Sequence, residues 1–272
     1  MKLRKLSRSN RASRAFSLLE LMVALAIFLV ICGVAFEMLL SAMRRYHDDA
    51  QLLNSFQEAR FGLDQMVRDI NDAGYPSRNQ YQSSVSPAVN KYASTAIAWS
   101  ESAGYPNTPC TIDSNCVVPG DFDIIVETDP TPNQPGHGVE WIRYKLQGTT
   151  LYRGAVYKDT SSAPDASTSG ADVLVPYVQN VMNNPPAAQL AALQAVYPAM
   201  YPGGNPVPVF QYYCESVPQP YDCTNAIAST HDPSHVVSVI VTLIVQAPTT
   251  EMQTGVPRVV QLRGEGRRLN PD

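Results

Sequence analysis

A carboxylate, Glu20, stands near the start of the most apolar segment of the chain. Between residues 16 and 40 the apolar and small residues are interrupted only by Ser17, Glu20 and Glu37. A carboxylate inside a bilayer helix costs about 2.5–3.5 kcal/mol unless it finds a partner. A cut between Ala15 and Phe16 would create an α-amino group four residues before Glu20, and that ammonium is its natural counter-charge. The alternative, that Glu20 lies at headgroup depth and needs no partner, stays open.

The residues ahead of this apolar segment set its expected orientation. Residues 1–15 hold no acidic side chain and six basic ones, which are Lys2, Arg4, Lys5, Arg8, Arg11 and Arg14. The positive-inside rule places this end in the cytoplasm, and the apolar segment is close to the roughly 20 residues that span a bilayer as a helix. We therefore expect a single-pass inner-membrane anchor with a cytoplasmic amino terminus and a periplasmic remainder.

The residues around the possible cut form a specific pattern. A small residue, Ala15, precedes Phe16, and Glu20 follows within a mainly apolar run from Arg14 to Ile27. This pattern resembles the class III signal of type IV prepilins and of type II secretion pseudopilins. The resemblance implies cleavage after Ala15 by a prepilin peptidase, N-methylation of the Phe16 amine, and pairing of Glu20 with the amine of a neighbouring subunit. Those families usually have glycine before the cut; alanine is nearest in size, so we expect processing.

Length and charge limit the remaining possibilities. A chain of 272 residues has room for an anchor and one globular head. Without residues 1–15 the chain carries 14 basic and 24 acidic groups, a net charge of −10. Such an acidic body argues against a general nucleic-acid-binding surface, which needs clustered lysine and arginine. Contact with DNA through a small local patch stays open.

The cysteines indicate an oxidising compartment. Cys32 lies alone in the apolar segment, whereas Cys110, Cys116, Cys214 and Cys223 lie in the polar remainder. Four cysteines allow three pairings, and the pairing that is local in sequence joins Cys110 to Cys116 and Cys214 to Cys223. Disulfides persist outside the cytoplasm, which fits a periplasmic head. Unpaired thiols or metal ligands are the alternatives.

Apolar periodicity predicts that the helix continues beyond the membrane. Apolar residues recur mainly three or four apart at Leu39, Met43, Tyr46, Ala50, Leu53, Phe56, Leu63, Val67 and Ile70. The opposite face is expected to be polar and carries Arg44, Arg45, Asp48, Asp49, Gln57, Glu58, Asp64, Arg68 and Asp69. Gly74 and Pro76 supply a C-cap and a stop, so a helix over residues 16–73 is predicted.

The rest of the chain is expected to form an antiparallel sheet laid on this helix, an α+β fold. The predicted strands are Phe122–Glu127, Val139–Leu146, Thr150–Gly154, Val173–Val181, Val207–Cys214, His235–Gln246 and Val256–Leu262. Alternation of apolar and polar residues in Val139–Leu146 predicts a half-buried hairpin that turns at Gln147 and Gly148. The nearly all-apolar Val236–Val245 predicts a central strand. A short helix is expected at Ala187–Val196. The domains are then a cleaved leader (1–15), a membrane or filament-core helix (16–40), an amphipathic helix half (41–76) and a β-rich head (77–272).

Four further groups of residues could take part in binding or chemistry. His231 and His235 with Cys223 form a weak metal candidate, because Pro233 prevents the histidines from sharing a helical face. The carboxylates of Asp121, Asp123, Glu127 and Asp129 suit Ca²⁺, but a solvated strand edge is the favoured interpretation. The aromatic residues are predicted to pack in the sheet rather than form an adhesive surface; these are Trp141, Tyr144, Tyr152, Tyr212 and Tyr213. The carboxyl-terminal arginines predict an exposed edge strand and tail; these are Arg258, Arg263, Arg267 and Arg268. No metal, cofactor or catalytic set is expected.

A second, weaker resemblance concerns the end of the helix. Residues 57–63, 67–70 and 73–75, with a looser match at Tyr177–Val181 and Val236–Val245, are similar to PilW-type minor pilins and J-type pseudopilins. Major pilins usually carry a helix-kinking proline where this chain has Glu37, and they are commonly shorter than the 257 residues left after the cut. Both departures favour a minor subunit.

The resemblances imply a structural protein without catalysis. We expect a minor pilin or pseudopilin that helps to initiate or cap a filament, with a prepilin peptidase, other pilins and an inner-membrane assembly platform as partners. The alternative is a binding module displayed on the filament, either an adhesin or a DNA-uptake receptor. A membrane-tethered enzyme is a third hypothesis, for which the sequence offers no convergent catalytic residues.

Overall fold

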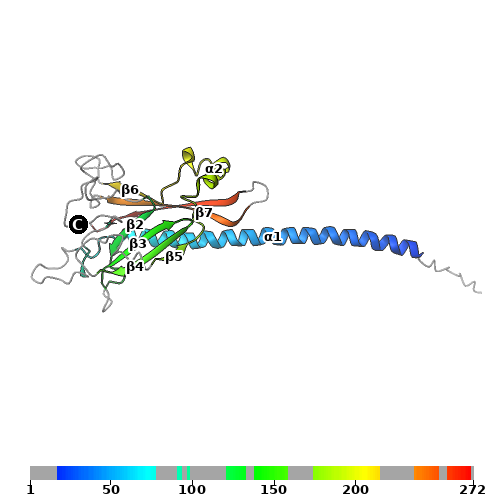
Figure 1. Ribbon diagram of the computed structural model, residues 1–272. Helices are drawn as coiled ribbons and strands as arrows, with labels where there is room; N and C mark the ends of the chain where they lie inside the picture. The colour runs from blue at the N-terminus through cyan, green and yellow to red at the C-terminus, as the bar shows by residue number, and fades with distance from the viewer. Residues whose placement is uncertain are drawn as a thin grey trace, which may run out of the picture. The chain divides into compact units, whose positions relative to one another are not determined.

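A computed structural model describes residues 17–77, 91–93, 97–98, 121–132, 138–158, 174–214, 236–250 and 256–270 (Figure 1). The chain divides into two compact units, Met1–Asp49 and Ala50–Asp272. A long apolar helix and antiparallel sheets make up the fold, as the α+β prediction requires. The expected limits of leader, anchor and head at residues 15, 40 and 76 stay predictions.

The helix α1 runs from Leu18 to Asn71 over 54 residues, slightly inside the predicted range. It ends two residues early because residues 72–74 form a turn in which Gly74 has a φ of 83°. Glycine adopts a positive φ at little steric cost, so the predicted role of Gly74 in ending the helix is confirmed. The Gly74 N–H then donates to the Glu127 carbonyl at 2.9 Å, which ties the end of the helix to a strand of the head.

The first sheet has five strands in the order β1-β2-β3-β4-β5, each antiparallel to its neighbour. The strands are β1 (Ile97–Ala98), β2 (Asp123–Thr128), β3 (Glu140–Gln147), β4 (Thr150–Tyr157) and β5 (Val175–Val178). The predicted hairpin is confirmed, because Gln147 pairs with Thr150 across a tight turn at Gly148. The two-residue strand β1 was not predicted, since so short a segment carries no alternation.

Burial on both faces of β3 contradicts the predicted half-buried strand. Consecutive residues of β3, which point to opposite faces, are all at most 1% exposed; they are Trp141, Ile142, Arg143 and Tyr144. β3 is the central strand of its sheet: it pairs with β4 along its whole length and with β2 from Glu140 to Lys145. Arg143 is therefore a polar residue of β3 that is buried inside the protein, whereas Lys145 is 35% exposed.

The last three strands form a second sheet in the order β6-β7-β8, so the prediction of one sheet is wrong. These strands are β6 (Phe210–Cys214), β7 (Val236–Thr250) and β8 (Pro257–Arg267). The prediction that the apolar β7 is a central strand is confirmed, because both β6 and β8 pair with it. The predicted edge strand with exposed arginines is also confirmed, since β8 lies at the edge of this sheet and Arg258, Arg263 and Arg267 are exposed.

The chain passes from one sheet to the other just after β5. Asn180 has a positive φ of 59°, a conformation that asparagine tolerates better than most residues. Its carbonyl accepts from the Gln246 N–H at 3.0 Å, and the Met182 N–H donates to the Ile244 carbonyl at 2.7 Å. The segment after β5 therefore leaves the first sheet and bonds to β7 of the second.

The side chain of Asn183 completes this crossing. Asn183 is fully buried, and its Nδ2 donates to the carbonyls of Val207 at 3.1 Å and Thr242 at 2.9 Å. Its Oδ1 accepts from the Ile244 N–H at 2.8 Å. One amide side chain thus forms hydrogen bonds with three backbone groups, two of them on β7. Backbone groups of a buried strand need such partners, because leaving them unpaired away from water is costly.

The second half of α1 packs against both sheets. Its buried residues Ala59, Leu63, Met66 and Ile70 share one hydrophobic core with residues of β2, β3, β6 and β7. α1 and β5 can approach each other closely because a glycine, Gly62, lies at their contact. A Cβ atom at Gly62 would overlap the Cγ2 of Val178 in β5. The absence of a side chain at Gly62 therefore lets β5 pack closely against α1.

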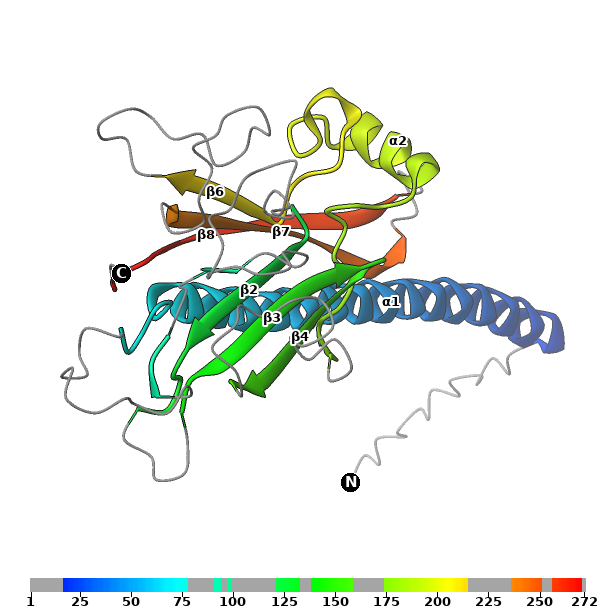
Figure 2. The same ribbon diagram turned by 60° about the vertical axis from the view of Figure 1, so that its left-hand side comes forward.

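The helix α2 (Ala187–Val196) has the predicted bounds and covers the other face of the second sheet (Figure 2). Leu190 and Leu193 of α2 and Tyr201 after it pack with Ile244 of β7 and Val259 of β8. The short 3₁₀ helix η4 (Pro202–Gly204) then leads back toward β6. Both faces of β7 are covered, which explains its nearly continuous apolar sequence.

Candidate functional site

The helix begins with a reciprocal pair of hydrogen bonds between Ser17 and Glu20. The Glu20 N–H donates to Ser17 Oγ at 3.3 Å, and the Ser17 N–H donates to Glu20 Oε2 at 3.0 Å. The Ser17 carbonyl accepts the first bond of the helix, from the Leu21 N–H at 3.2 Å. This is a capping box, in which two N–H groups left over at a helix start are satisfied by side chains.

The capping box changes the account of Glu20. Its carboxylate has a local partner, but that partner is a neutral N–H and the negative charge stays uncompensated by any cation within the described part of the chain. Glu20 is exposed, so an ammonium can still approach it. The role of Ser17 was missed at the level of sequence, although serine followed three residues later by glutamate before an apolar run is a readable signal.

Side chains along the apolar segment face outward. Large apolar residues from Leu18 to Leu40 are 43–77% exposed, and no part of the most apolar window is buried. By length and composition, α1 is the one helix in the described part of the chain that can cross a membrane. Cys32 and Glu37 are exposed on the same segment. A surface this apolar needs lipid or other apolar helices around it.

The structure places few of the other predicted site residues. Ala15 and Phe16 lie outside the described residues, as do Cys110, Cys116 and Cys223. Cys214 ends β6, and its side chain is likewise outside the description. The histidines His231 and His235 also fall there. The cut, the methylation, the disulfide pairing and that metal candidate therefore stay predictions.

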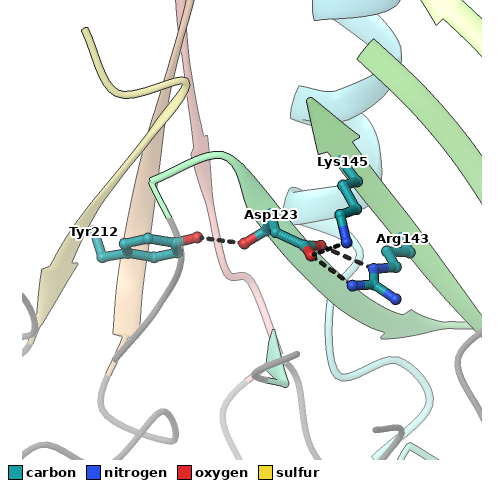
Figure 3. A network of polar contacts seen from close by, with 4 residues as sticks. All are labelled: Asp123, Arg143, Lys145 and Tyr212. Atoms are coloured by element: carbon teal, nitrogen blue, oxygen red, sulfur yellow. Dashed lines mark hydrogen bonds and ion pairs between the residues drawn. The ribbon is translucent and has the colours of Figure 1, made fainter. Parts of the chain in front are cut away.

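Two members of the acidic cluster, Asp123 and Glu127, lie on β2, and the prediction of a solvated edge is wrong for both, whereas Asp121, before β2, is exposed. Arg143 on β3 donates to both Asp123 oxygens, from Nε at 2.9 Å and from Nη2 at 2.5 Å (Figure 3). Lys145 Nζ lies 3.7 Å from Asp123 Oδ2. Tyr212 on β6 donates to the Asp123 carbonyl at 3.5 Å, so the same residue also contacts the second sheet (Figure 3).

Glu127 lies four residues after Asp123 on the same face of β2. It is fully buried and forms an ion pair with Lys158. Lys158 also donates to the Tyr92 carbonyl at 3.1 Å, and its ammonium lies 5.1 Å from the centre of the Tyr92 ring. Both charges are removed from water, and each is stabilised by the other. Within the described residues, no three histidine, cysteine or acidic side chains are grouped to hold a metal ion.

A third network joins α1 to the first sheet. Asp69, expected on the polar face of the helix, is only 3% exposed and accepts from the Tyr144 hydroxyl at 2.5 Å and from Arg153 Nη2 at 3.3 Å. Gln65 donates to its other oxygen at 2.7 Å. Burial is the main cause that raises the pKa of Tyr144 above its ordinary value. The charge of Asp69 adds to this rise, and Arg153 opposes it. The tyrosine therefore stays protonated and acts as a donor.

The aromatic residues mostly pack, as predicted. Trp141, Tyr144 and Tyr212 are at most 5% exposed, whereas Tyr213 is 51% exposed and does not fit the prediction. Tyr152 is half-buried. Each described charged network of the head joins elements of the fold to one another, so these networks stabilise the head. Ser17 and Glu20 at the start of α1, by contrast, are exposed.

The comparisons with known proteins concern this same start of the helix. Residues 10–36 match the family model described as the prokaryotic N-terminal methylation motif. No curated protein and no solved structure matches the chain. The match covers the expected cut, Phe16, the capping box and Glu20. The motif indicates a type IV pilin-like or pseudopilin-like precursor, which implies processing by a prepilin peptidase and assembly with other pilins.

Proposed function

We propose that this protein is a minor pilin or pseudopilin, a structural subunit that helps to initiate or cap a type IV pilus or a type II secretion pseudopilus. The observation that carries the proposal is the N-terminal methylation motif at residues 10–36 on a helix whose apolar side chains are exposed. Such a helix suits a subunit that is held in lipid first and among other apolar helices afterwards.

The proposed processing takes place at the cytoplasmic face. The peptidase hydrolyses the bond between Ala15 and Phe16, which removes the basic leader and leaves an ammonium at Phe16. Methylation of that amine retains its positive charge. The ammonium of a neighbouring subunit then pairs with Glu20, replacing the interaction with the neutral Ser17 N–H by one with a cation, which is stronger in a medium of low dielectric constant.

Two features favour a minor subunit over a major one. α1 is helical through Glu37, at the position where the major pilins that the chain resembles usually carry a kinking proline. The head has two sheets and an additional helix, α2, and so offers more surface for specific neighbours. The inner-membrane assembly platform and the other pilins are its proposed partners, with the head in the periplasm and its four cysteines in disulfides.

Cell fractionation tests the proposed role. The chain should be recovered with filaments sheared from the surface, or with the overexpressed pseudopilus, in amounts far below those of the major subunit. A strain that lacks the prepilin peptidase is the control, and it should retain all of the chain, uncut, in the inner membrane. Complete retention in the membrane of cells that assemble normal filaments would contradict the proposal.

A further inference from the structure

Of the four sheet edges in the described part of the chain, three are short or already bonded. In the first sheet β1 has only two residues, and β5 carries Pro176, which has no N–H to offer a further strand. In the second sheet the Phe210 N–H of β6 donates to the Asp121 carbonyl at 3.0 Å. The remaining edge is β8, the longest of these edge strands at 11 residues (Figure 2).

The hydrogen bonds of β8 show which of its backbone groups face outward. The Arg268 N–H donates to the Val237 carbonyl at 2.9 Å, so even-numbered residues bond toward β7. The Arg267 N–H instead donates to Asn71 Oδ1 at the end of α1, at 2.7 Å. Since alternate residues of an edge strand face away from its neighbour, the odd-numbered residues turn their N–H and C=O groups outward. Among the described residues no partner is found for the outward groups of Gln261, Arg263 and Glu265.

The side chains along this open edge alternate in charge. Arg263, Glu265 and Arg267 lie on one face of β8, all are exposed, and none forms an ion pair within the described structure. Charges often protect an edge strand, but a row of mixed sign can select a strand of complementary sequence. Glu265 between the two arginines also repels a polyanion such as a nucleic acid. The row therefore fits an extended polypeptide with acidic, basic and acidic residues at alternate positions.

A second copy of this chain does not fit the edge in the symmetric way. A Cβ atom at Gly264 would meet Leu63 of α1, and one at Gly266 would meet Ile70, so β8 runs alongside the helix in the same direction. Antiparallel pairing of β8 with the β8 of a second copy would set the two α1 helices antiparallel. Two chains anchored in one membrane cannot adopt that arrangement.

We propose that the open edge of β8 binds an extended segment of a partner protein by strand addition, with acidic residues of that segment opposite Arg263 and Arg267 and a basic residue opposite Glu265. The added strand bonds to the N–H and C=O groups that β8 turns outward, and the three charged side chains select its sequence. Its intervening side chains fall beside the half-buried Val260 and Leu262, which suits small apolar residues. Strand addition goes beyond the proposed filament role and does not depend on it.

Binding of two fluorescent heptapeptides to the detergent-solubilised full chain tests the proposed selectivity. The peptide Thr-Glu-Val-Lys-Val-Glu-Thr presents the complementary pattern in either strand direction, and Thr-Lys-Val-Glu-Val-Lys-Thr has the charges exchanged. Fluorescence anisotropy should show the first bound at least about tenfold more tightly, because three attractive cross-strand pairs replace three repulsive ones. Non-specific attraction predicts the opposite order, since the chain carries a net charge of −4 and would favour the cationic peptide.

The variant Glu265→Pro separates strand addition from simple attraction between charges. Proline removes an outward N–H and leaves the bonds to β7 in place, so this variant should fold normally but bind the first peptide at least about tenfold more weakly. Glu265→Thr is the matched control. It removes the same charge but keeps the N–H, and it should change binding less than about threefold. Thermal unfolding of both variants checks the fold.

Exchanging the charges of the edge should exchange its preference. The triple variant Arg263→Glu, Glu265→Lys and Arg267→Glu should bind the second peptide more tightly than the first. Failure of the unchanged chain to bind either peptide would show that the charges only keep other strands away, and it would overturn the proposal. Equal binding by Glu265→Pro and Glu265→Thr would overturn strand addition. A dimeric chain that becomes monomeric in Glu265→Pro and binds neither peptide would assign the edge to a second copy instead.

Discussion

Replacing Glu20 with glutamine should leave a stable, processed membrane protein whose recovery in filaments falls at least about tenfold. Glutamine keeps the reciprocal bonds of the capping box with Ser17 but removes the charge. The loss would therefore measure the missing ion pair with the incoming amine, which is strong in a medium that excludes water. The measurement is the ratio of the chain in sheared filaments to the chain in membranes, by immunoblot.

Glu37 provides the matched control for this variant. It is a second exposed carboxylate on the same apolar segment, and the residue four positions before it is Gly33, which offers no cation. Glu37→Gln should therefore enter filaments as the unchanged protein does. Glu20→Ala should do no better than Glu20→Gln, since it lacks both the charge and the cap. Equal incorporation of Glu20→Gln and the unchanged protein would remove Glu20 from the assembly mechanism.

Replacing Lys158 with methionine should lower the free energy of unfolding of the head by about 3–5 kcal/mol. The substitution leaves Glu127, which is 0% exposed, as a buried carboxylate without its cation. Denaturant unfolding of the detergent-solubilised full chain, followed by tryptophan fluorescence, measures the change. Trp141 pairs directly with Glu127 across β2 and β3, so it reports on this region.

Two further variants show whether the effect comes from the unpaired charge. The double variant Lys158→Met with Glu127→Gln should recover much of the stability, because it removes the carboxylate together with its partner. Lys145→Met is the matched control, since Lys145 is 35% exposed at 3.7 Å from Asp123 and should cost less than about 1 kcal/mol. A loss of similar size in Lys145→Met would mean that burial does not decide the contribution of these pairs.

Features that depend on local sequence were predictable. The 3.6-residue period and the pair Gly74 and Pro76 predicted α1 and its end to within two residues. The apolar window of Ala187–Val196 predicted α2 with its observed bounds. The strand pair joined at Gly148 was also found, because a two-residue turn with glycine between alternating strands has few other solutions.

Features that depend on distant partners were not predictable in the same way. Asp69 and Glu127 looked like surface carboxylates, and their partners Arg153 and Lys158 are 84 and 31 residues further along the chain. The division into two sheets depends on the crossing after β5, where the buried amide of Asn183 bonds to β7. An asparagine in a proline-rich stretch has no periodicity that predicts such a role.

The residues at the start of the helix carry two signals that can be read from the sequence. The pattern around Phe16 and Glu20 predicted the motif that residues 10–36 match. The capping box between Ser17 and Glu20 follows from the same residues but was not predicted. The structure adds that Glu20 also defines where the helix begins, two residues after the expected cut.

The mass of the amino-terminal peptide, measured on protein extracted from membranes with and without a co-expressed prepilin peptidase, tests the account most directly. We predict an intact leader without the peptidase and, with it, a new terminus at N-methylated Phe16, despite alanine at position 15. A chain that stays uncut, or that is cut elsewhere, would contradict the account and leave a membrane-anchored protein outside the pilin pathway.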